Sequence, residues 1–122
     1  MVVTAPGPIV EQILAQLFIA FGQGAGTMTV SHEAIAAARN LYINRIPEFE
    51  NKWDEIALQS LEYAHAIGRV AALRAVQHGR NVISKDDWIE AAKQVAQHPD
   101  KTYRFCPICM GAGGSIPEIL GV

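Results

Sequence analysis

Charge and cysteine are scarce in this sequence of 122 residues. Only 18% of the residues are charged and 50% are hydrophobic, a composition that argues against a disordered chain. The 2 cysteines are too few for the disulfide framework of a small secreted protein. No apolar run reaches the roughly 20 residues that span a bilayer, and the N-terminal residues lack the positive charge of a signal peptide. We therefore expect a soluble, cytoplasmic protein with no membrane association.

Sequence signatures of common enzymes are also missing. Gly22, Gly24 and Gly26 follow a predicted helix, whereas a phosphate-binding loop follows a strand. The pair His32-Glu33 lacks the second histidine of the HExxH motif of zinc proteases, and no GxSxG motif of serine hydrolases occurs. The sequence therefore predicts a protein that is not an enzyme, with no catalytic residues and no nucleotide cofactor.

Helical periodicity begins at Pro8. Apolar side chains recur every three or four residues after it, and proline suits the first turn of a helix because its missing N–H has no partner there. The segment Gly22–Gly26 predicts a flexible break. Ser31 predicts the N-cap of a second helix. We expect this helix to end at Pro47, because the residue before a proline avoids the helical conformation, and residues 47–52 to form an acidic loop.

A long helix from Trp53 to Arg80 is the predicted central element. It contains no proline and is rich in good helix formers, and it is much longer than the average helix of about 11–12 residues. Its polar residues follow one narrow stripe that consists of Glu55, Gln59, Glu62, Arg69, Gln77 and Arg80. Another face has mostly small side chains, namely Ala57, Leu61, Ala64, Gly68, Ala72 and Ala75. Because small side chains let a neighbouring helix approach, this face predicts a close crossing at Gly68.

The residues after the long helix predict a turn, a short extended pair and a last helix. Gly79 is placed to end the long helix, and Ser84 with Asp87 forms a capping box in which aspartate replaces glutamate. No internal repeat is visible. The predicted fold is all-α: a four-helix domain over residues 1–98 with one long central helix, followed by an extended C-terminal tail over residues 99–122.

The segment Ala75–Asp87, with the sequence AVQHGRNVISKDD, resembles the histone fold. There, a long helix ends in a similar glycine-arginine turn and a short β segment leads into the next helix through an Ile-Ser/Thr-x-x-Asp phrase. The resemblance covers roughly residues 52–97, with Ser31–Ile46 as a candidate first helix. It implies pairing through the long helices, and hence a homo- or hetero-oligomer. The helical lid of AAA+ ATPases carries a similar phrase, but this chain lacks a Walker A sequence and is too short for the ATPase core.

Charge is distributed unevenly along the chain, although the net charge is only −2. Residues 1–62 hold three basic and seven acidic side chains, whereas residues 69–104 hold seven basic and four acidic ones. The basic half could face an anionic partner such as nucleic acid. The net charge does not support this, because a histone that wraps DNA is strongly basic. A chance distribution explains the asymmetry equally well.

Two cysteines near the C-terminus carry the sharpest chemical signal. Cys106 and Cys109 lie in the sequence CPICMGAG, which matches CxxCxGxG and resembles the zinc-binding repeat of the DnaJ cysteine-rich region. A tight turn can direct two thiolates at one tetrahedral zinc ion. DnaJ-type sites use two such repeats per zinc, and this chain has one. A second copy of the chain, His98 or a partner protein could supply the missing ligands.

Other interpretations of the cysteine pair remain open. CPxC is similar to the glutaredoxin active site, but the residues after Cys109 are a poor start for the helix that lowers the pKa of such a thiol. Two ordinary reduced thiols are the third interpretation.

Taken together, these features predict a non-enzymatic, oligomeric interaction protein of a larger assembly, which could be DNA-associated, with a zinc-stabilised tail. A chaperone-like adaptor that binds polypeptide through the CxxCxGxG knuckle is the alternative. A small thiol redox protein is a weaker third hypothesis.

Overall fold

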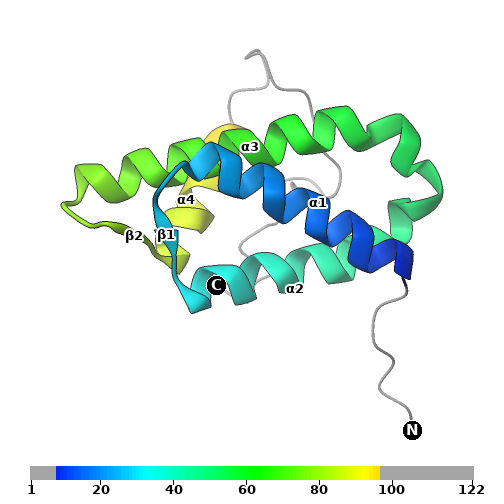
Figure 1. Cartoon of the computed structure of the whole chain (residues 1–122), viewed down its shortest axis with the longest axis horizontal. Coiled ribbons are helices and arrows are strands. Elements are labelled where there is room, and N and C mark those ends of the chain that lie inside the picture. Colours follow the sequence, from blue (N-terminus) through cyan, green and yellow to red (C-terminus); the bar gives the residue numbers. More distant parts are fainter. Residues whose placement is uncertain (1–7, 97–122) are drawn as a thin grey trace, which may run out of the picture.

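The structure, a computed structural model, describes residues 8–96, which are mostly helical as predicted (Figure 1). In chain order the elements are α1 (Pro8–Ala25), β1 (Thr29–Val30), α2 (His32–Phe49), the 3-10 turn η1 (Glu50–Lys52), α3 (Trp53–Gln77), β2 (Val82–Ile83) and α4 (Lys85–Ala96). The predicted tail, residues 99–122, lies outside the described residues.

The predicted long helix corresponds to α3, which begins at Trp53 as expected and ends at Gln77 rather than at Arg80. Residues 32–77 are helical without interruption, and the chain reverses at η1, so that α2 and α3 run in opposite directions (Figure 1). The prediction of a loop over residues 47–52 is wrong, because Pro47 lies inside α2. Its missing N–H removes a hydrogen bond only in the last turn, where little helix remains to be disrupted. The reversal occurs at Phe49 and Lys52, whose φ angles of −123° and −109° depart from the helical value of about −63°.

The predicted break at Gly22–Gly26 is also wrong, because α1 continues through Gly22 and Gly24 to Ala25. Tertiary contact accounts for this. A Cβ atom added to Gly24 would lie 2.0 Å from the carbonyl oxygen of His65, and one added to Gly68 would lie 2.1 Å from that of Phe21. The backbones of α1 and α3 therefore meet directly. The close crossing predicted at Gly68 is confirmed, and the crossing helix is α1 of the same chain.

A hydrophobic core fills the space between the four helices. The largest of its fully buried side chains come from α1, α2, α3 and α4: Ile13, Leu17, Leu41, Tyr42, Ile46, Tyr63, Ile67, Trp88 and Val95, together with Ile83 of β2. The rings of Phe18 and Tyr42 pack edge to face with their centroids 5.8 Å apart, a contact that stabilises the packing of α1 against α2. The helices α2 and α3, which η1 connects, therefore both contribute side chains to one core.

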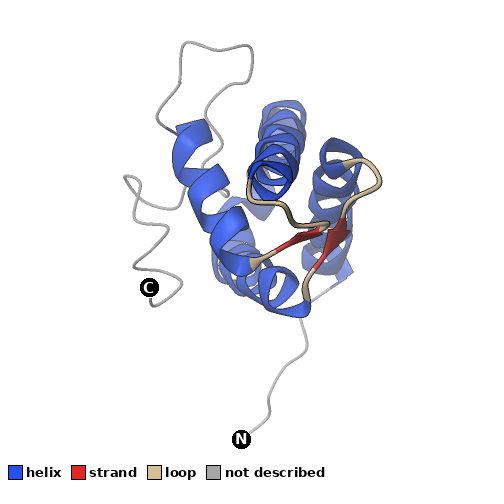
Figure 2. Ribbon diagram, turned by 90° about the vertical axis from the view of Figure 1, so that its left-hand side faces the viewer, coloured by secondary structure: helices blue, strands red, loops and turns tan. Residues whose placement is uncertain are grey.

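Two equivalent turns join the helix pairs. Gly26 after α1 and Gly79 after α3 both have positive φ angles, +67° and +72°. Glycine adopts this left-handed conformation without steric cost, so it ends both helices. Each turn leads into a two-residue strand, and β1 and β2 pair in parallel at one end of the helices, the end that faces the viewer in Figure 2.

The helices that follow the two strands begin in the same way. Ser31 Oγ accepts a hydrogen bond from the Ala34 N–H, and Ser84 Oγ accepts one from the Asp87 N–H, both at 3.1 Å. Both predicted N-caps are therefore confirmed. The described residues form two helix–strand–helix units with equivalent turns and caps, although the sequence shows no internal repeat. The repeat is one of local conformation, since few residues are identical between the two units.

Candidate functional site

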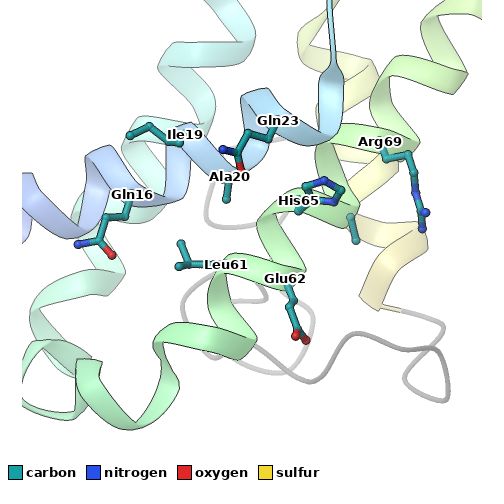
Figure 3. A pocket seen from close by; sticks show the side chains of 9 residues that line it. Gln16, Ile19, Ala20, Gln23, Leu61, Glu62, His65 and Arg69 are labelled. Atoms are coloured by element: carbon teal, nitrogen blue, oxygen red, sulfur yellow. The ribbon is translucent and has the colours of Figure 1, made fainter.

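An open groove of about 570 Å³ lies between α1 and α3 (Figure 3). Gln16, Ile19, Ala20 and Gln23 of α1 line one side, and Leu61, Glu62, His65, Ala66 and Arg69 of α3 line the other. His65, which lines the groove, also contacts Gly24 through its backbone at the close helix crossing. The groove therefore begins where the two backbones diverge from their contact.

The outward side of α3 continues this surface as a stripe with exposed leucines. We call it the α3 stripe: Leu58, Glu62, His65, Arg69, Leu73 and Val76, all exposed and spaced three or four residues apart, so that they share one side of the helix. Leu58, Leu73 and Val76 are 72%, 56% and 60% exposed. On α1, Ile19 at the rim of the groove is 61% exposed. Large apolar side chains are thus concentrated on one surface formed by two neighbouring helices.

The sequence predicted a polar stripe on this side of the long helix, and that interpretation was incomplete. Glu62 and Arg69 are exposed as expected, but Leu58, Leu73 and Val76 lie beside them. Their spacing relative to Glu62 and Arg69 was visible in the sequence and could have identified them. The face of small side chains was instead expected to contact a neighbouring helix. The structure places α1 of the same chain against it at Gly68, and the α3 stripe lies about a quarter-turn away from it around the helix.

The strongest polar cluster in the described part of the chain joins the end of α3 to α4. Asp87 is fully buried and forms ion pairs with Arg80, at 2.5 Å, and with Arg74, at 3.3 Å. Its other carboxylate oxygen accepts a hydrogen bond of 2.9 Å from the Ser84 N–H, which completes the predicted capping box. Burial alone would raise the pKa of Asp87. Hydrogen bonds from Arg80 and Ser84, with the charge of Arg80, outweigh it and hold the pKa below its ordinary value.

This cluster is structural in its geometry. Arg80 belongs to the turn after Gly79, and Asp87 to the first turn of α4, so the ion pair closes the second helix–strand–helix unit. The acceptor atoms of Asp87 are occupied by protein groups, and the side chain is shielded from solvent.

The predicted metal ligands Cys106 and Cys109, and the alternative ligand His98, lie outside the described residues. Within residues 8–96, no group of three or more His, Cys, Asp or Glu side chains is placed to hold a metal ion. Nor does this part of the chain contain a helix of sufficient length and hydropathy to cross a membrane.

Comparisons with protein-family models, with curated proteins and with solved structures find no match to this chain. Function is therefore inferred from the exposed surface formed by α1 and α3.

Proposed function

We propose that this chain is a non-enzymatic interaction protein that works as an oligomer within a larger assembly. The observation that carries the proposal is the cluster of exposed apolar side chains on the α3 stripe and at the rim of the groove. Single exposed apolar residues are ordinary on a soluble protein, whereas a group of them on one surface marks an interaction site.

The few charges on this surface support the same proposal. Between Leu58 and Val76, the α3 stripe carries one acidic and one basic side chain, Glu62 and Arg69. The centres of protein interfaces are similarly depleted of charged residues. Glu62, His65 and Arg69 are exposed, whereas catalytic groups are typically desolvated in a closed site. Binding of a macromolecule therefore explains this surface better than catalysis does.

The likeness of Ala75–Asp87 to the histone fold adds support, because histone-fold chains pair through their long helices. A DNA-associated assembly is one setting for such a protein. A salt titration of DNA binding tests that setting, because contacts to phosphates make affinity fall steeply with salt concentration. The chaperone-like alternative predicts binding of unfolded polypeptide with little dependence on salt.

Zinc at Cys106 and Cys109 is part of the proposal. One CxxC motif supplies two ligands, and structural zinc sites have four, so we propose that a second copy of the chain completes the site. The stoichiometry would then be one zinc ion for every two chains.

Light scattering over a range of concentrations tests the proposed oligomer. We expect a mass at least twice the 13.3 kDa of one chain, and a shift toward one chain for Leu58→Asp. Ile35→Asp is a matched control, because Ile35 is also an exposed apolar residue (40%) but lies on α2. A single-chain mass at every concentration would contradict the proposal.

A further inference from the structure

We infer that the partner on this surface is a second copy of the chain, with the two α3 helices antiparallel about a twofold axis near His65 and Ala66. This inference rests on the proposed function and adds the partner and the pairing geometry. It starts from the order of exposed side chains along the α3 stripe. Along α3 this order is Leu58, Glu62, His65, Arg69 and Leu73. On each side of His65 there is first a charged residue and then a leucine, and the two charges have opposite signs.

Antiparallel pairing brings complementary groups together at the two charged and the two leucine positions of this series. Glu62 lies opposite the partner subunit's Arg69, and Arg69 lies opposite the partner subunit's Glu62. Leu58 and Leu73 meet the partner subunit's Leu73 and Leu58 in the same way. Because a helix rises about 1.5 Å per residue, the two charged side chains are about 10 Å apart along the axis and the two leucines about 22 Å apart. Each charge pair is therefore flanked by a contact between leucines.

Other arrangements of two copies lose this match. A parallel pairing in the same position would place Glu62 against the partner subunit's Glu62 and Arg69 against the partner subunit's Arg69. Like charges at an interface are strongly unfavourable, and they select against such an arrangement. A twofold axis requires one surface to be complementary to itself, and the mirrored order of the α3 stripe from Leu58 to Leu73 meets that requirement.

The exposure of the leucines supplies the apolar area for pairing. Leu58 and Leu73 are 72% and 56% exposed, although each lies in a stable helix with a buried opposite face. Ile19, at 61% exposure on α1, lies across the groove from the stripe and can extend the contact beyond one helix. A second copy of the chain accounts for leucines and opposite charges at mirrored positions between Leu58 and Leu73.

Charge exchange between the two positions tests the geometry. Glu62→Arg places two arginines against each other at both charge pairs, and Arg69→Glu places two glutamates against each other. We expect each single variant to raise the dimer dissociation constant on the order of tenfold or more in low-salt buffer. The double variant Glu62→Arg/Arg69→Glu restores both pairs and is expected to dimerise like the wild type. An equimolar mixture of the two single variants should form a heterodimer, because every charge then meets its opposite.

Sedimentation velocity on the wild type, the variants and the mixture measures these outcomes, and far-UV circular dichroism verifies that each variant is folded. Glu33→Arg is the control for a change of charge, because Glu33 is exposed on α2, away from the α3 stripe. A wild-type oligomer that both single variants leave unchanged overturns the antiparallel pairing but leaves the proposed function standing. The pairing is also overturned if both single variants dissociate and their mixture stays monomeric. A wild type that is monomeric throughout overturns both proposals.

Discussion

Replacing Gly68 with alanine should destabilise the protein, although alanine is the better helix former. The new Cβ would lie 2.1 Å from the carbonyl oxygen of Phe21 and 3.0 Å from the backbone nitrogen of Ala25, whereas ordinary contact begins at 3.4 Å. Both neighbouring atoms belong to the backbone of α1, so the two helices must separate by more than 1 Å. Overpacking of this kind costs up to about 3 kcal/mol. The gain in helix propensity is about 1 kcal/mol, which leaves a net loss of about 2 kcal/mol.

Urea unfolding followed by far-UV circular dichroism measures this loss, which corresponds to a decrease of roughly 10 °C in Tm for a domain of this size. Gly22→Ala is the matched control, because Gly22 lies in α1 and a Cβ there would meet no atom within 4 Å. We expect that variant to gain about 0.5–1 kcal/mol from helix propensity alone. If Gly68→Ala were as stable as the control, the helices would not touch at this position, and the explanation of the crossing would be refuted.

Three further predictions concern the polar contacts and the cysteines. Folding lowers the pKa of Asp87, so the unfolded chain takes up this proton first as the pH falls, and stability is retained above about pH 4 and lost below it. In thermal melts, Asp87→Asn should be less stable than the wild type at pH 7 by about 1–3 kcal/mol, and its stability should fall less in acid. Ser31→Ala removes an N-cap bond and should cost about 1 kcal/mol in urea unfolding, with an unchanged stability arguing against the cap. Cys106→Ser should abolish bound zinc in elemental analysis, and the metal proposal fails if the wild type, purified with zinc present, holds none.

Local features of the chain were predictable because they depend on neighbouring residues. The capping serines and the glycine that ends the long helix were all predicted, and the structure confirms Ser31, Ser84 with Asp87, and Gly79. Each of these features satisfies backbone groups within a few residues of itself. Such contacts can be identified from residue type and spacing alone.

Features set by distant contacts were missed. Gly24 has a low helix propensity, and a loop was expected around it, but the absence of a side chain is what lets α1 approach His65. Pro47 was expected to end a helix, whereas it occupies the last turn of α2. The two equivalent units were not visible because they share the positions of a glycine and a serine and little else.

The candidate site was predicted only in part. Glu62 and Arg69 were identified as a solvated polar stripe, but Leu58 and Leu73 were not considered as part of the same surface. Hydrophobic residues on a helix are expected to face the core, and only the packing of α1 and α4 shows that these two do not. The small-residue face at Gly68 is covered by α1 of the same chain, and the interaction surface that we propose is the α3 stripe beside it.

The solution mass of the purified wild type, measured from micromolar to high micromolar concentration in low-salt buffer, tests the central claim most directly. Our account predicts a concentration-dependent approach to at least twice 13.3 kDa, with the exposed leucines of the α3 stripe covered. A constant mass of one chain over the whole range would contradict it.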